Sequence, residues 1–194
     1  MEYRRLGNTG LIVSTIALGT MQFGQKMNMG NLDQAATNEQ VRFALDRGIN
    51  FIDTADVYSL GESETLLGNA LKGIREEVVL ATKVYNNMSA EDWPNGRGLS
   101  ALHIKQAVEG SLKRLQTDYI DLYQIHWPRR VVPLAETLGA LEKLREQGKV
   151  RAIGVCNFGV SLLRDERLIG RQKVQAACKC ACRGGERGLL AGHL

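Results

Sequence analysis

Four side chains with complementary acid and base chemistry follow short apolar segments of the chain. Asp53 closes one such segment, Lys83 closes the next, and His126 lies just past a third. Tyr58 follows Asp53 by five residues. When neighbouring strands run parallel in a barrel, their carboxyl ends meet at one rim, so we expect the four side chains to share one site.

These groups suit the donation of a proton to an oxygen that gains negative charge, as a carbonyl oxygen does when its carbon accepts a hydride. Tyr58 is the expected acid, and a close Lys83 ammonium should lower the pKa of its phenol toward neutral pH. A lysine in a partly dry site needs a carboxylate to stay charged, and Asp53 can supply it. His126 can donate a hydrogen bond that orients the substrate oxygen. None of the four is needed as a metal ligand.

Each of these residues also has an ordinary structural explanation. A tyrosine after a strand often lines a pocket, a lysine at a strand end is usually a solvated charge, and an aspartate before a threonine commonly caps a helix or turn. Only the joint pattern favours a shared catalytic site over these separate roles.

Short apolar runs alternate with amphipathic stretches, which is typical of a parallel sheet with crossover helices. We expect strands over residues 14–18, 50–53, 78–83, 119–124 and 150–155. We expect helices over residues 38–47, up to Gly73, from Ser100 to Leu115, and from Pro133 to Gly148. The nearly continuous apolar character of the strands implies that both faces of the sheet are covered.

The first helix has the clearest predicted ends. Thr37 and Gln40 stand at the spacing of a capping box, in which side chains satisfy free backbone amides of the first turn. Gly48 should close the helix, because glycine readily adopts the left-handed conformation that follows many helices.

Two architectures are compatible with these elements. A doubly wound sheet would normally carry the glycine pattern G-x-G-x-x-G after its first strand, but residues 19–24 read Gly-Thr-Met-Gln-Phe-Gly. The alternative is a (β/α)₈ barrel, in which catalytic groups come from the carboxyl ends of several strands. The residue pattern favours the barrel without excluding the sheet.

Several segments resemble signatures of the aldo-keto reductase family. They are residues 5–14, 50–58 with 61–64, 81–83, 118–128 and 148–158. The resemblance covers residues 1 to about 163 and implies a (β/α)₈ TIM barrel whose floor is plugged by an N-terminal β-hairpin. It also implies an oxidoreductase that reduces aldehydes or ketones with NADPH, or alternatively NADH, as the hydride donor.

The resemblance assigns roles to individual residues. Tyr58 is the proton donor, Lys83 and Asp53 tune it, and His126 orients the carbonyl. The residues implied to contact the cofactor are Gly19, Thr20, Met21, Asp53, Cys156 and Asn157, and Trp127 is implied to form a wall of the substrate pocket. Cys156 stands where the family usually has serine, a better hydrogen-bond former, and a small buried hydrophobe is the favoured interpretation of this thiol.

The family pattern stops after five strand-helix units. Residues 1–163 therefore form the expected barrel portion, and residues 164–194 form a divergent, basic, Cys-rich tail that we expect to be disordered. Lys173 to Ala176 could begin a sixth strand, whereas the sequence from Ala177 shows no strand or helix periodicity. A truncated barrel of five to six units is the expected fold, and its open edges would allow self-association or aggregation.

Composition narrows the classes of function. Hydrophobic residues make up 44% and charged residues 24%, and no apolar run is long enough to cross a membrane. The net charge of +4 arises in the tail, so no basic stripe for a nucleic acid is predicted. The absence of a recognisable leader favours a cytoplasmic protein without disulfides. The cysteines of the tail lack the second ligand pair that a zinc site needs.

Three functional hypotheses remain open at this point. The first is a working reductase, and the second is a binding or regulatory module, since the same fold also occurs in auxiliary subunits of potassium channels. The third is an inactive fragment, because the loops that hold the adenosine end of the cofactor in this family have no counterpart in the sequence.

Overall fold

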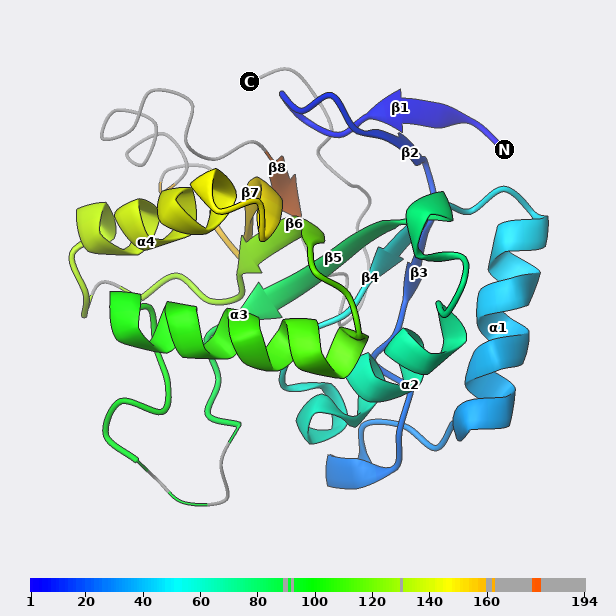
Figure 1. The fold of residues 1–194 in the computed structure, drawn as a ribbon, viewed down its shortest axis with the longest axis horizontal. Coiled ribbons are helices and arrows are strands. Elements are labelled where there is room, and N and C mark those ends of the chain that lie inside the picture. Colours follow the sequence, from blue (N-terminus) through cyan, green and yellow to red (C-terminus); the bar gives the residue numbers. More distant parts are fainter. Residues whose placement is uncertain (89–90, 92, 130, 160–161, 163–175, 179–194) are drawn as a thin grey trace.

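A curved parallel sheet with helices along one face dominates the computed structural model (Figure 1). The structure describes residues 1–88, 91, 93–129, 131–159, 162 and 176–178. The sheet order is β3 (Ala17–Gly19), β4 (Phe51–Asp53), β5 (Val79–Val84), β6 (Ile120–Ile125), β7 (Val150–Cys156) and β8 (Ala176–Cys178). Every neighbouring pair is parallel. The fold is thus an incomplete (β/α)₈ barrel, as predicted.

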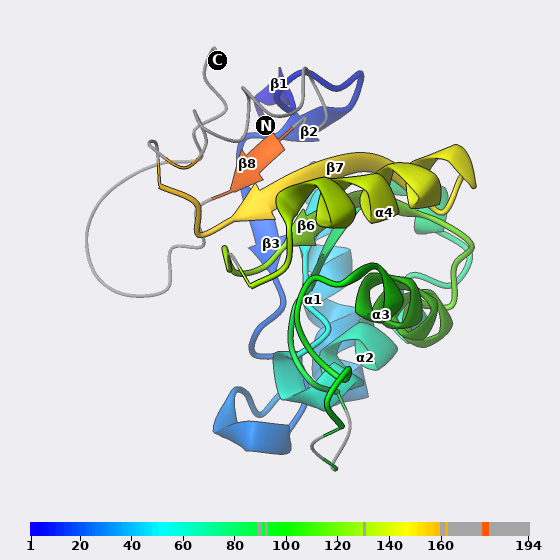
Figure 2. The same ribbon diagram turned by 90° about the vertical axis from the view of Figure 1, so that its left-hand side faces the viewer.

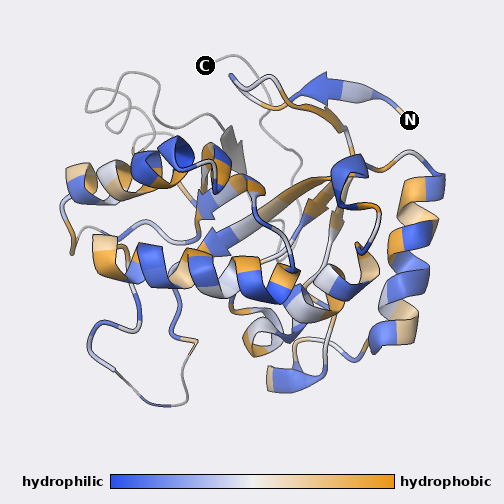
Figure 3. Ribbon diagram, viewed as in Figure 1, coloured by the Kyte–Doolittle hydropathy of each residue, from blue (hydrophilic) through white to orange (hydrophobic). Residues whose placement is uncertain are grey.

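A helix connects each of the first four strands of the sheet to the next. The helices are α1 (Gln34–Asp46), α2 (Glu62–Ala70), α3 (Ala101–Leu115) and α4 (Leu134–Glu146), with short 3-10 turns η1 (Lys26–Asn28), η2 (Tyr58–Gly61) and η3 (Arg75–Glu77). Figure 2 shows the four long helices on the outer side of the curved sheet. Their solvent-facing sides are largely hydrophilic, whereas the strands are mostly hydrophobic (Figure 3). The larger apolar core lies between these two layers.

The predicted N-terminal hairpin is confirmed. Strands β1 (Tyr3–Arg5) and β2 (Ile12–Ser14) pair in antiparallel register, and the hairpin lies across one end of the sheet (Figure 1). Its Leu6 and Val13 pack against side chains from the inner face of the sheet. These are Phe51, Ala81, Leu122 and Ala152. Because an inner sheet face is apolar, this plug removes it from water.

The predicted start of the first barrel strand is wrong. Ser14 ends hairpin strand β2, and the first strand of the large sheet begins at Ala17. The backbone amide of Ser14 donates to the Asn50 side chain at 2.8 Å, and the backbone amide of Asn50 donates to the Ser14 hydroxyl at 3.2 Å. These bonds fix Ser14 beside the start of β4, so the chain must turn before β3.

The first helix begins four residues earlier than predicted. Asp33 is its N-cap, and one oxygen of its side chain accepts from the Ala36 amide at 2.9 Å. Thr37 is fully buried inside the helix. An aspartate cap satisfies a free amide of the first turn as well as the predicted threonine would, so the earlier cap is sufficient.

The sixth strand lies where the tail was expected to lose regular structure. Strand β8 continues the sheet beyond β7, with Cys156 opposite Cys178. The prediction of no strand from Ala177 onward is therefore wrong for Ala177 and Cys178. Residues 164–175 and 179–194 lie outside the described residues, so the predicted disorder of the tail and its remaining cysteines stays a prediction.

Helix α2 approaches the end of α3 at a glycine. A Cβ atom at Gly68 would lie 2.6 Å from the carbonyl oxygen of Arg114 and 2.7 Å from that of Leu115. Backbone atoms cannot rotate away as side chains do. A side chain at this position would therefore push the two helices apart.

We predict that Gly68→Ala destabilises the protein by about 1–3 kcal/mol, through overpacking of the contact between α2 and α3. The matched control is Gly139→Ala in α4, where an added Cβ would meet nothing within 4 Å. The control should be neutral or stabilising by up to about 1 kcal/mol, since alanine favours helix. Urea unfolding of both variants measures the difference, and equal stabilities would contradict the argument.

A buried polar layer lies behind the segment that connects β4 to α2. The Asp56 side chain is fully buried, and neither of its oxygens has a partner in hydrogen-bond geometry among the described residues. Glu64, also fully buried, accepts from the Thr82 hydroxyl at 2.6 Å and from Arg114 Nε at 2.7 Å. Burial also raises the pKa of the Tyr123 phenol, so this hydroxyl stays neutral.

Asp56 keeps its proton at neutral pH. Burial, reinforced by the negative charge of Glu64, raises the pKa of its carboxyl from 3.8 to about 8. The backbone amides of Val57 and Tyr85 and the Arg114 guanidinium oppose this shift only in part. The neutral carboxyl avoids the cost of burying a negative charge that is only partly compensated.

We predict that Asp56→Asn is more stable than the parent chain at pH 8 and that this advantage shrinks toward pH 4. Between pH 4 and 8 the unfolded chain ionises Asp56 while the folded chain keeps the proton, so stability falls as the pH rises through this window. Asparagine cannot ionise and removes that loss. Thermal unfolding midpoints at several pH values measure the effect, and a difference independent of pH would refute it.

Candidate active site

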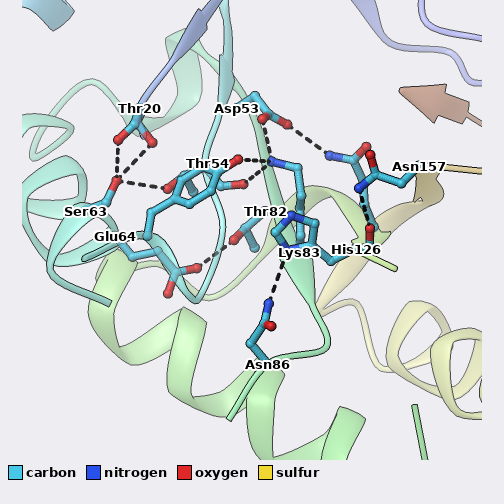
Figure 4. Close-up of polar contacts among 12 residues, drawn as sticks. Thr20, Asp53, Thr54, Ser63, Glu64, Thr82, Lys83, Asn86, His126 and Asn157 are labelled. Carbon is cyan, nitrogen blue, oxygen red and sulfur yellow. Dashed lines mark hydrogen bonds and ion pairs between the residues drawn. The ribbon is translucent and has the colours of Figure 1, made fainter. Parts of the chain in front are cut away.

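The sheet register brings the carboxyl ends of the strands together at one rim. Gly19 pairs with Asp53, and Asp53 pairs with Ala81, two residues before Lys83. His126 follows the last residue of β6, and its backbone amide donates to the Val84 carbonyl at 3.0 Å. Figure 4 shows the resulting cluster.

Lys83 lies at the centre of the cluster and is fully buried. Its ammonium donates to Asp53 Oδ1 at 2.5 Å, to the Thr54 carbonyl at 2.8 Å and to the Tyr58 hydroxyl at 3.3 Å. A buried ammonium is tolerated only when acceptors and an opposite charge replace water. The structure thus brings together three of the four residues predicted from the sequence, in the predicted relation.

His126 completes the cluster. Its ring meets the Tyr58 ring edge-on, with centroids 6.2 Å apart and planes at 84°. The Asn86 amide nitrogen lies 3.5 Å from Nδ1 of the imidazole. In the tautomer that carries its proton on Nε2, Nδ1 can accept from this amide and Nε2 is left to donate.

The residues predicted to contact substrate or cofactor surround this cluster. Trp127 is 44% exposed and stacks on His126, with centroids 5.4 Å apart. Asn157 has a left-handed backbone, with φ of 61°, and its amide nitrogen donates to the His126 carbonyl at 2.8 Å. Cys156 is a fully buried free thiol at the end of β7.

The segment after β3 reaches the same rim. The Thr20 amide donates to the Asp53 carbonyl at 3.0 Å, and Thr20 is fully buried. Gly19 has no atom within 4 Å of where a Cβ would be, and Met21 is 40% exposed. The two residues that flank Thr20 are therefore open to a molecule bound at the rim.

Serine and threonine side chains tie these segments to α2. The Ser63 hydroxyl donates to the Thr20 carbonyl at 2.8 Å and lies 3.3 Å from the Thr54 hydroxyl. Thr54 is the residue whose carbonyl accepts from Lys83. The first turn of α2 is thus bonded to the residue that follows Asp53 and to the residue that follows β3.

Sequence reasoning missed four members of the cluster, namely Thr54, Ser63, Asn86 and Gln124. Gln124 is the one that carried a usable signal, since it is an uncharged polar residue on the same strand face as apolar Ile120 and Leu122. Its Nε2 donates to Asp53 Oδ2 at 3.0 Å. Thr54 contributes a backbone carbonyl, and a pattern of side-chain types cannot predict the use of a backbone group.

No group of three or more His, Cys, Asp or Glu side chains within the described ranges could hold a metal ion. No helix in the described part of the chain is long and apolar enough to span a bilayer.

Comparison with known sequences identifies relatives of this chain. A model of the Aldo/keto reductase family matches residues 15–177. Aldo-keto reductase YhdN of Bacillus subtilis is 45% identical over 174 residues, which cover 87% of this chain and 51% of that protein. Protein tas of Escherichia coli is 38% identical over 195 residues, which cover 82% of this chain and 54% of that protein.

Solved structures give the same result. The holo form of aldo-keto reductase AKR11C1 from Bacillus halodurans superimposes with a TM-score of 0.81 at 36% identity, over 92% of this chain and 57% of that one. The thermostable aldo-keto reductase Tm1743 gives a TM-score of 0.78 at 34% identity, over 92% of this chain and 62% of that one. The chain spans about half the length of the curated relatives it matches. The family model and the solved structures agree, and the chain belongs to the aldo/keto reductase family.

Proposed function

We propose that this protein reduces aldehydes or ketones to alcohols with a nicotinamide cofactor and that Tyr58 donates the proton. The observation that carries the proposal is the Lys83 ammonium, which contacts both Asp53 Oδ1 and the Tyr58 hydroxyl. The positive charge favours the phenolate that remains after proton donation. The Asp53 carboxylate keeps Lys83 charged in a buried position.

The residues at the rim fit a nicotinamide. Asn157 directs its amide nitrogen to the His126 carbonyl, so its side-chain oxygen is the atom that can accept from a carboxamide. Gly19 and Met21 leave open surface beside Asp53. NADPH is the proposed donor and NADH the alternative. When bound, the cofactor supplies a hydride to the carbonyl carbon.

The chain itself supplies the proton and the orientation. The Nε2–H of His126 can donate to the carbonyl oxygen and hold it toward the Tyr58 hydroxyl. The phenol then transfers its proton to this oxygen as negative charge develops there. Tyr58 regains a proton from solvent, and Trp127 offers an apolar wall for the substrate. This is general acid catalysis with electrostatic support.

The two other hypotheses have weaker support. A binding or regulatory module would not need an ammonium between a carboxylate and a phenol, so the intact cluster favours an enzyme. The hypothesis of an inactive fragment predicts that the chain does not bind NADPH, and a binding measurement tests it. Saturable quenching of tryptophan fluorescence that is lost in Trp127→Phe would exclude the inactive fragment. Turnover that vanishes in Tyr58→Phe would then support the reductase, whereas binding without turnover would support the binding module. Self-association through the sheet edges stays a prediction for sedimentation velocity.

We predict that Tyr58→Phe lowers kcat/KM for aldehyde reduction by about 10²–10⁴-fold, the usual contribution of a positioned general acid. NADPH binding should change little, since the ring remains. Tyr3→Phe is the matched control, because the Tyr3 hydroxyl binds the Gly48 carbonyl in the hairpin region. The loss of NADPH absorbance on oxidation measures turnover. An active Tyr58→Phe variant would exclude the proposed proton donor.

We predict that Lys83→Met abolishes turnover and destabilises the fold by about 3–5 kcal/mol, because Asp53 is left without its cation. The double variant Asp53→Asn with Lys83→Met should regain at least half of that stability, while turnover stays lost. Urea unfolding and NADPH oxidation separate the two effects. Recovery of activity in the double variant would show that the ion pair has only a structural role.

A further inference from the structure

Gln124 occupies a position that the proposed mechanism does not yet use. It is fully buried in β6 and pairs across the sheet with Lys83 on one side and Gly154 on the other. Cross-strand partners project from the same face of a sheet. The side chain of Gln124 therefore lies beside that of Lys83, and the glycine on β7 adds no side chain that could compete.

The two oxygens of Asp53 have separate partners. Oδ1 accepts from Lys83 at 2.5 Å, and Oδ2 accepts from Gln124 Nε2 at 3.0 Å. Figure 4 shows the Asp53 carboxylate bonded to Lys83. With both oxygens held, the carboxylate cannot rotate Oδ1 away from the ammonium without losing the second bond.

The orientation of the Gln124 amide is itself informative. Its Oε1 atom is buried and has no hydrogen-bond partner among the described residues. A buried amide oxygen without a donor is unfavourable, so Oε1 itself does not favour the observed orientation. The opposite orientation would place Oε1 against Oδ2 of Asp53, where two acceptors repel each other. The contact with Asp53 thus determines how the amide lies.

We propose that Gln124 is a positioning residue for Tyr58, which holds the Asp53 carboxylate against Lys83 and thereby keeps the ammonium charged beside the phenol. This inference rests on the proposed role of Tyr58. It extends the chain of contacts to four residues on three strands and the 3-10 turn η2, of which only Tyr58 meets the substrate. Gln124 acts on the acid solely through Asp53, because its side chain makes no other hydrogen bond in the described part of the chain.

The test measures the acidity of Tyr58 directly and needs no turnover. Tyrosine labelled with ¹³C at Cζ is followed by NMR against pH in the full chain, and Tyr58→Phe identifies the signal among the five tyrosines. Gln124→Met keeps the approximate shape and removes the donor, and Gln124→Asn keeps the amide but is too short to reach Asp53. Both variants should raise the midpoint of Tyr58 by about one pH unit, the scale of a lost neighbouring hydrogen bond or charge. Using two variants protects the test against a folding defect in one.

A double-variant cycle tests the route of the effect. In an Asp53→Asn background, Gln124→Met should leave the Tyr58 midpoint unchanged, because the carboxylate through which it acts is gone. Thr37→Val, which removes a buried hydroxyl from α1, is the control and should not move the midpoint in either background. An equal shift with and without Asp53 would overturn the inference.

The outcomes also separate this inference from the proposed function. If Lys83→Met raises the Tyr58 midpoint and the two Gln124 variants do not, the inference is wrong while the proposed acid stands. If Lys83→Met also has no effect, the electrostatic basis of the proposed function fails and the inference fails with it. The expected result is a shift in all three variants, with the shift of Gln124→Met lost in the Asp53→Asn background.

Discussion

The buried contact between the Lys83 ammonium and the Asp53 carboxylate is the interaction on which the site depends. A fully buried ammonium loses its hydration, and only the carboxylate and nearby oxygens offset that loss. The contact in turn depends on the register of β4 and β5, since a slip of one residue would turn Lys83 to the opposite face of the sheet. Sheet pairing and site chemistry are therefore one constraint.

Helix α2 holds the ends of the paired strands in place at the site. Its first turn binds the segments on both sides of Asp53 through Ser63, while Glu64 joins Thr82 on β5 to Arg114 on α3. The close approach at Gly68 allows α2 to lie near α3. Hydroxyl and carboxylate side chains thus fix strand ends that the apolar core alone would leave free to shift.

Three buried polar groups without described hydrogen-bond partners belong to β6 and to the segment before Tyr58. The Asp56 carboxyl, the Tyr123 hydroxyl and the Gln124 carbonyl are all buried without hydrogen-bond partners among the described residues. Such groups lower stability, and folded proteins tolerate them mainly where function requires a particular arrangement. Asp56 lies two residues before Tyr58, and Gln124 contacts Asp53, so two of these groups lie close to the proposed acid.

The sequence by itself determined the alternation of parallel strands with helices and the grouping of Asp53, Tyr58, Lys83 and His126, because apolar periodicity marks strands and the ends of parallel strands share one rim. The choice of a barrel over an open sheet and the plugging hairpin came from the resemblance to aldo-keto reductases, which the structure confirms. Only the tertiary structure decided the Asp33 cap, strand β8 and the hydrogen bond from Gln124 to Asp53. Each of these features depends on which hydrogen-bond partners meet in the folded chain, and several of those partners are backbone groups. Such pairings produce no periodic pattern of residue types in the sequence.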